Sequence, residues 1–167
     1  EFRRVLFRSD SNVIVDGLNG TSLEIIKHLI LSGLSKLSIL DNSNVKLEDL
    51  SDTYYLCKED IGKNKLKCVI NKLKSLNPYV KVVENQIINY DLYILVDNSI
   101  EKAIYINKEI RKLNKKFIWV NSIGIVGNIF CDFLKHKTFD LDGEELSISI
   151  IRSEEHTSEL QSHSDLV

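Results

Sequence analysis

The alternation of apolar and polar positions along the chain predicts strands and amphipathic helices in turn. Apolar, often β-branched runs that suit buried strands occur at 13–15, 36–40, 79–83, 91–96 and 117–120. Apolar residues at helical spacing predict helices over 23–30, 65–76 and 100–113. The run 123–133 suits a strand pair at a sheet edge, and a last strand is expected at Glu145 to Ile151, after a turn at Asp140 to Gly143. This order predicts an α/β fold whose mostly parallel sheet is covered by helices on both faces.

A glycine-containing turn joins the first predicted strand to the first predicted helix. Residues 16–20 read DGLNG, and the next two, Thr21 and Ser22, are good helix-capping types. Free backbone N–H groups at a helix N-terminus attract phosphate, so this strand, turn and helix are typical of a nucleotide-binding α/β fold. The second predicted strand ends at Asp41, where such folds place an acidic residue for the ribose hydroxyls.

Composition narrows the class of protein and of partner. The 167 residues are 43% hydrophobic and 28% charged, which is ordinary for a soluble globular domain with a sizeable core. The net charge of -2 gives no basic footprint, so no nucleic-acid partner is expected. There is no apolar run of membrane-spanning length and no visible signal peptide, so no membrane partner is expected. The protein is predicted to be cytoplasmic and nuclear, because its three cysteines are interpreted as reduced thiols.

The three cysteines are predicted to be reduced thiols, because their spacing fits neither a zinc site nor a disulfide framework. Cys131 lies in an apolar stretch and is expected in the core, whereas Cys68 is expected to be partly exposed on a helix. Cys57 is predicted in a loop beside Lys58, whose charge could lower the thiol pKa. None of them is a convincing thioester nucleophile.

The two ends of the chain share an unusual relationship. Residues 1–9 read EFRRVLFRS and residues 152–162 read RSEEHTSELQS, and the two can be encoded by complementary stretches of one oligonucleotide that resembles a sequencing adapter. We therefore expect 1–9 and 152–167 to be adapter-derived rather than native. The genuine domain is then 10–151, and we expect it to be cut at both ends.

Four stretches resemble a known family. GLNGTSLEIIKHLILSG at 17–33, DLSDTYYLCKEDIGKNK at 49–65 and LNPYV at 76–80 resemble the adenylation domains of ubiquitin-activating enzymes, within the wider ThiF and MoeB superfamily. IVGNIFCDF at 125–133 resembles the N-terminal, inactive adenylation half of the single-chain ubiquitin-activating enzyme. The resemblance covers 12–151 and implies a Rossmann-like, ThiF-type three-layer fold, truncated here.

The resemblance implies an enzyme that adenylates the C-terminus of ubiquitin with ATP and Mg²⁺ and passes it to a cysteine as a thioester. Two homologous halves form a pseudo-dimer in which only the active half holds ATP and Mg²⁺. This half is then expected to support the active half and to contact ubiquitin or a ubiquitin-like modifier. We expect no catalytic residue, no metal ligand and no bound cofactor on this fragment, which alone should not be catalytic.

By the same resemblance, a vestigial nucleotide pocket is formed by six residues: Gly17, Asn19, Gly20, Asp41, Lys65 and Asp97. Active members carry the fuller GxGxxG motif, whereas Asn19 and Ser22 stand at two of those glycine positions. Active members also carry a phosphate-binding Arg where this chain has Asp52. At ~4 Å and an effective dielectric near 20, that charge reversal is worth several kcal/mol against triphosphate.

The retained positions also fit purely structural interpretations. Lys65 matches the family's phosphate-facing Lys but also fits a solvated helix lysine, and Asp97 matches the Mg²⁺-binding Asp but also fits a cap for the next helix. Asp41 fits a loop-capping carboxylate as well as a ribose ligand. Gly17 and Gly20 fit plain turn glycines that never meet phosphate.

Two other functions remain open at this point. One is a regulatory subunit of a SUMO- or NEDD8-type activating enzyme, and the other is a free-standing ThiF/MoeB-like adenylyltransferase with a rebuilt site. The scaffold interpretation predicts a surface around 45–55 that pairs with the active half, with Tyr54 and Tyr55 as anchors. Ordinary core packing is the alternative for both tyrosines.

Overall fold

The computed structural model of the chain describes residues 10–135. The two ends expected to be adapter-derived lie outside the described residues. So do the turn expected at Asp140 to Gly143 and the strand expected at Glu145 to Ile151.

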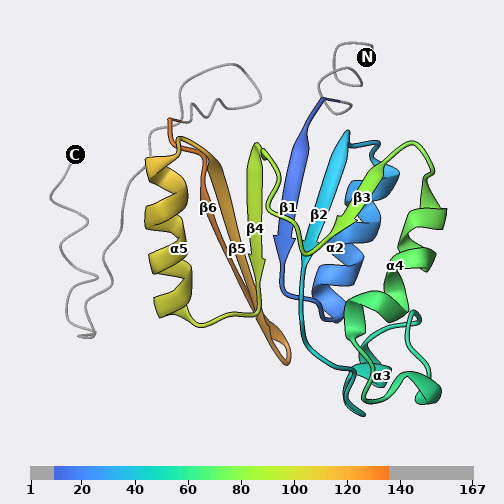
Figure 1. The fold of residues 1–167 in the computed structure, drawn as a ribbon. Helices are drawn as coiled ribbons and strands as arrows, with labels where there is room; N and C mark the ends of the chain where they lie inside the picture. The colour runs from blue at the N-terminus through green and yellow to red at the C-terminus, as the bar shows by residue number, and fades with distance from the viewer. Residues whose placement is uncertain (1–9, 136–167) are drawn as a thin grey trace, which may run out of the picture. The chain divides into compact units, whose positions relative to one another are not determined.

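One six-stranded sheet forms the centre of the domain (Figure 1). Its strand order is β3-β2-β1-β4-β5-β6, in which the first five strands are parallel and β6 runs antiparallel to β5. The strands are β1 (Asn12–Asp16), β2 (Lys36–Leu40), β3 (Lys81–Glu84), β4 (Leu92–Val96), β5 (Lys116–Ile123) and β6 (Val126–Asp132). The predicted α/β class with a mostly parallel sheet is confirmed.

Helices cover both faces of this sheet, as Figure 1 shows. Helices α2 (Gly20–Leu31) and α4 (Lys65–Leu76) pack on the face that carries Val13 and Val15. Helix α5 (Ile100–Lys112) packs on the other face, against Leu95 and Phe117. Because successive side chains of a strand point to opposite faces, β4 and β5 contribute apolar side chains to the hydrophobic clusters on both faces of the sheet.

A short irregular region connects β2 to α4. It contains α3 (Asp49–Asp52) and the single 3₁₀ turn η1 (Lys58–Asp60).

The strand order creates a topological switch point between β1 and β4. The chain leaves β1 toward β2 on one side, whereas β4 continues the sheet on the other. In open α/β sheets, ligands bind in the crevice outside the carboxyl ends of the strands at such a point. The DGLNG turn follows β1 directly and therefore lies at this crevice.

Cys131 is exposed, which corrects the prediction that it lies in the core. It belongs to β6, where every residue except Asp132 is exposed. The apolar character of this stretch thus predicted a strand at the sheet edge correctly, but not the burial of its side chains.

Candidate functional site

Both glycines of the turn are required by close approaches within the chain itself. Gly17 has a φ of +99°, and a Cβ at this position would lie 2.7 Å from the carbonyl oxygen of Val96. A Cβ on Gly20 would lie 2.7 Å from the carbonyl oxygen of Asp52, the last residue of α3. The space beside each glycine is therefore filled by backbone rather than left open for a ligand.

The N-terminus of α2 is closed by a reciprocal cap. The Asn19 Oδ1 accepts a hydrogen bond from the Ser22 N–H at 2.8 Å, and the Ser22 Oγ accepts one from the Asn19 N–H at 2.7 Å. These are two of the N–H groups with which a helix N-terminus would hold an anion. The two residues that depart from the glycine motif thus satisfy two of the donors that phosphate would use.

Asp41 acts as a cap for the loop rather than presenting a free carboxylate. Its Oδ2 accepts the Leu18 N–H at 3.0 Å, and its Oδ1 accepts the Ser43 N–H at 2.8 Å and the Ser43 hydroxyl at 2.6 Å. The structural interpretation of Asp41 is confirmed, and the Leu18 N–H of the turn is occupied.

Lys65 is buried, so its interpretation as a solvated surface lysine is wrong. Its side chain is 9% exposed, and its Nζ donates to the Asp49 Oδ1 at 2.8 Å and to the Leu18 carbonyl oxygen at 3.1 Å. Burial would raise the pKa of the Asp49 carboxyl, but hydrogen bonds from Lys65 and from the Lys46 N–H outweigh it and lower the pKa. The Lys65 ammonium thus already forms an ion pair with a carboxylate of its own chain.

Asp97 joins three elements at the switch point. It follows β4 with a positive φ of 47°, and its Oδ1 accepts the N–H of Ser122 in β5 at 2.7 Å. Its Oδ2 accepts a hydrogen bond from the Asn19 side-chain amide. It does not cap α5, because the Ser99 side chain fills that role, so the capping interpretation is wrong.

A cleft of about 530 Å³ lies at these strand ends, and sequence reasoning missed several of its lining residues. Asn85 accepts the Asp41 N–H at 2.8 Å, and the Asn98 amide donates to the Val96 carbonyl oxygen at 2.9 Å. Lys102 of α5 donates to the Asn98 Oδ1 at 2.8 Å. The available signal was that Asn85 and Asn98 come just after predicted strands.

Asp16, at the end of β1, also lines this cleft. Its Oδ2 accepts the Tyr93 hydroxyl at 2.8 Å. Burial, followed by the charge of Asp16, raises the pKa of Tyr93, so the phenol stays protonated and keeps donating to Asp16.

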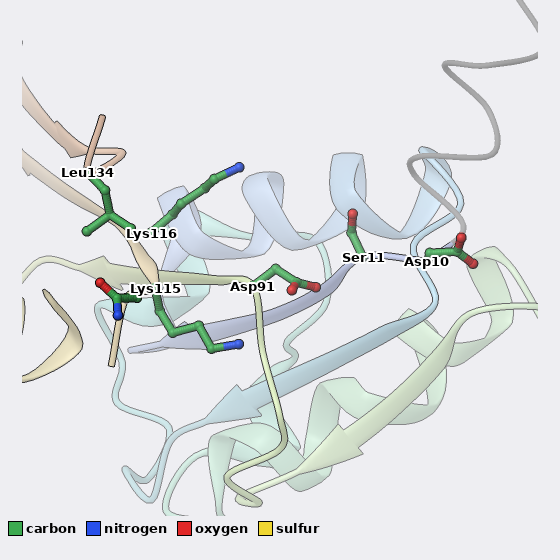
Figure 2. Close-up of a pocket in the computed structure, with 7 residues that line it drawn as sticks. Asp10, Ser11, Asp91, Lys115, Lys116 and Leu134 are labelled. Carbon is green, nitrogen blue, oxygen red and sulfur yellow. The ribbon is translucent and has the colours of Figure 1, made fainter. Parts of the chain in front are cut away.

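A second cavity, of about 540 Å³, lies at the opposite, amino ends of the strands (Figure 2). Asp91 precedes β4, and its Oδ2 accepts the Asn12 N–H at 2.9 Å. Lys115 precedes β5, and its Nζ lies 3.3 Å from the Asn89 Oδ1 and 5.9 Å from the centre of the Tyr90 ring. These contacts link the loops that precede neighbouring strands, at the edge of the sheet away from the glycine turn.

Cys57 and Cys68 show no sign of nucleophilic activation, because the pKa of each thiol is raised. A hydrogen bond with Asp60, together with the nearby Glu59, raises the pKa of Cys57 to about 11, so the expected lowering by Lys58 is wrong. Cys68 is partly buried, as predicted. Within residues 10–135 no group of three potential ligands could hold a metal ion, and no helix is both long and apolar enough to span a bilayer.

The parallel sheet, the glycine turn at its switch point and the capped helix that follows define a Rossmann-type domain of nucleotide-binding architecture. The ThiF family model matches residues 6–140. The chain therefore belongs to the ThiF family.

The most similar relatives include ubiquitin-activating enzyme E1 2 of Arabidopsis thaliana, 36% identical over 92% of this chain, and ubiquitin-activating enzyme E1 1 of Schizosaccharomyces pombe, 33% identical over 87%. Ubiquitin-like modifier-activating enzyme 1 of Rattus norvegicus is 31% identical over 81%. The chain spans only 15%, 15% and 14% of these proteins, respectively. It is thus homologous to ubiquitin-activating enzymes over a small part of their length.

Solved structures agree on the fold. The crystal structure of E. coli MccB with AMPCPP and MccA aligns with a TM-score of 0.68 at 19% identity, covering 75% of this chain and 41% of that one. The predicted ThiF-type, Rossmann-like fold is confirmed.

Proposed function

We propose that this chain is part of the inactive adenylation half of a ubiquitin-activating enzyme. In this role it supports the active half, which holds ATP and Mg²⁺, and contacts ubiquitin or a related modifier. The fragment itself binds no cofactor and performs no adenylation, and residues 10–151 are its native part. The protein that contains it works in the cytoplasm and nucleus.

The observation that carries this proposal is that N–H groups at the glycine turn already have hydrogen-bond partners within the chain. Leu18 donates its N–H to Asp41 and accepts from Lys65, while Asn19 and Ser22 satisfy each other's N–H groups. Lys65 is itself paired with Asp49. An incoming phosphate would have to break these bonds before it could pair with the N–H groups of Leu18, Asn19 or Ser22, so each of those contacts would replace one that already exists.

Charge around the turn also disfavours a triphosphate. The carboxylates that contact or adjoin it belong to five residues: Asp16, Asp41, Asp49, Asp52 and Asp97. The lysines at the site are Lys65, which is already paired with Asp49, and Lys102, which lines the cleft. A phosphate at this position would meet net repulsion, which the Arg of an active member would turn into attraction.

The proposed pairing surface with the active half is supported at Tyr54 but not at Tyr55. Tyr54 is fully exposed beside α3, and Leu47 in the same region is 72% exposed. Tyr55 packs against the main core, so its alternative role in core packing is confirmed. We therefore place the anchor at Tyr54, because exposed aromatic residues often dominate binding energy once buried in an interface.

Titration calorimetry with Mg²⁺ and ATP tests the proposal directly. We expect no saturable heat at ATP concentrations up to the millimolar range, for the chain as given and for Asp97→Ala. Micromolar binding that Asp97→Ala abolishes would instead establish the free-standing adenylyltransferase alternative. A catalytically active half of a ubiquitin-activating enzyme serves as the positive control.

A second assay addresses the partner. The chain should bind the active half of a ubiquitin-activating enzyme, and Tyr54→Ala should weaken that binding about 30-fold or more, as expected for loss of a buried aromatic anchor. Tyr79→Ala is the matched control, because Tyr79 is 93% exposed outside this region. Preference for the active subunit of a SUMO- or NEDD8-type enzyme would instead identify a regulatory subunit of that kind.

A further inference from the structure

Strand β6 forms one edge of the sheet. It is the outermost strand on its side, and its only strand partner among the described residues is β5 (Figure 1). The pair of Ile123 and Val126 closes a two-residue turn, so Val126 and every second residue after it point their backbone groups toward β5. The N–H and C=O groups of Gly127, Ile129 and Cys131 therefore point away from the sheet, where a further strand could pair with them.

This edge lacks the charges that usually keep strand edges apart. Residues 117–131 contain no charged side chain, in a chain that is 28% charged overall. The strand at the opposite edge, β3, is only four residues long and carries the exposed Lys81 and, at its end, Glu84. Short strands and charged side chains are the means by which native proteins prevent edge pairing. By this criterion β3 is protected, whereas β6, which is seven residues long, is not.

The side chains along β6 are apolar and exposed. Val126, Ile129 and Phe130 are 60%, 73% and 48% exposed. Single apolar residues are common on protein surfaces, but a contiguous exposed group marks an interaction site. Because backbone donors and acceptors lie along the same edge, the partner that satisfies both kinds of group is another β-strand.

Strand β6 is complementary to a second copy of itself. A two-fold axis at Ile129 pairs this residue with Ile129 of the second copy and aligns all seven residues of the two antiparallel strands. Gly127 then faces Cys131, so the three outward-pointing residues of each copy can exchange backbone hydrogen bonds. Asp132, the only charged residue of β6, faces Val126, whereas parallel pairing in register would place Asp132 opposite itself.

Side chains support this register on both faces of the sheet. The two Ile129 side chains lie directly opposite each other, and the two Phe130 rings are diagonal neighbours, which aromatic side chains can bridge. The net charge of -2 gives little repulsion between two copies. Seven residues per copy are fewer than the roughly 20–30 of a standard interface, so the association should be weak.

We propose that two copies of this chain associate by antiparallel pairing of their β6 strands about a two-fold axis at Ile129. The pairing joins the two sheets into one continuous sheet. This inference rests on the edge of the sheet and does not depend on the proposed role of the glycine turn.

Sedimentation velocity of the full chain between about 1 and 300 µM tests the association, for which we expect a dissociation constant on the order of 10–100 µM. Ile129→Lys should weaken it at least 10-fold, because two ammonium groups would meet at the axis. Ile125→Lys is the matched control, because Ile125 is fully exposed but lies in the turn, outside the paired strand. An equimolar mixture of Ile129→Lys and Ile129→Glu should restore the dimer, since opposite charges would then meet across the axis.

Amide hydrogen exchange measures the pairing of the backbone. The Ile129 and Cys131 amides should exchange at least 10-fold more slowly at the highest concentration than at the lowest, whereas the Asn128 amide, which points toward β5, should not change. The proposal is overturned if the chain stays monomeric, if the two lysine variants associate equally, if the mixture stays monomeric, or if a dimer forms without this protection. Protection of the same amides in the dilute monomer would also overturn it, because the edge would then be covered within one chain.

Discussion

Removing the Asp49 carboxylate should leave the Lys65 ammonium buried without its ion-pair partner. The two side chains are 13% and 9% exposed, and Lys65 would keep only the Leu18 carbonyl oxygen as a partner. Breaking a buried pair by removing one member typically costs 3–5 kcal/mol, because an uncompensated charge stays behind. We therefore expect Asp49→Ala to lower the free energy of unfolding by about 3–5 kcal/mol, or the melting temperature by roughly 10 °C.

Urea denaturation followed by circular dichroism measures this loss. Glu48→Ala is the matched control, because Glu48 pairs with Lys46 on the surface with both side chains over 70% exposed, and such pairs are worth about 0–1 kcal/mol. The double variant Asp49→Leu, Lys65→Met should recover most of the loss. If Asp49→Ala and Glu48→Ala both lowered the free energy of unfolding by less than about 1 kcal/mol, the buried pair would be refuted and Lys65 would have to be solvated.

The same pair predicts a pH dependence. The pKa of Asp49 is lowered from its ordinary 3.8 in the folded state, so its contribution is complete above that value and is lost as pH falls through the folded pKa. The unmodified chain should therefore lose more stability between pH 5 and acid than Asp49→Ala does. Parallel acid titrations of the two would contradict the assignment.

Two further perturbations test the turn and the thiol. Gly20→Ala should cost about 1–3 kcal/mol in urea unfolding, because its Cβ would overlap the backbone of Asp52, whereas the nearest atom to a Cβ on Gly127 lies 3.8 Å away, so Gly127→Ala should be far milder. Comparable losses of unfolding free energy for Gly20→Ala and Gly127→Ala would show that the turn can accommodate a Cβ at Gly20. Cys57, with a pKa of about 11, should react slowly with iodoacetamide at pH 8, and Asp60→Asn should speed this roughly 10-fold by lowering the pKa. Peptide mass spectrometry measures the rate, and an unchanged rate would contradict the role of the carboxylate.

The local elements were largely predictable from sequence. The predicted ranges of β2 and α4, 36–40 and 65–76, match the observed bounds, because both segments have strong periodicity and clear stops. Strand β5 continues three residues beyond the predicted 117–120. Those residues are polar or exposed, and they are held by pairing with β6 rather than by burial.

The partners of the site residues were not predictable, since they depend on contacts distant in sequence. The helix pattern places Lys65 at the start of α4, but only the fold shows Asp49 beside it. Likewise, Cys57 adjoins Lys58 in sequence, whereas the turn of η1 brings the Asp60 carboxylate to the thiol. Asp97 stands two residues before the true cap of α5 and turns instead toward Asn19.

Side chains of this chain occupy the Leu18, Asn19 and Ser22 N–H groups, with which a glycine turn and the helix after it would bind phosphate. Amide resonances of Leu18, Asn19 and Ser22, recorded during titration with Mg²⁺ and ATP, test this occupancy most directly. The account predicts that these resonances stay in place up to millimolar ATP. Saturable shifts of all three at micromolar ATP would contradict it.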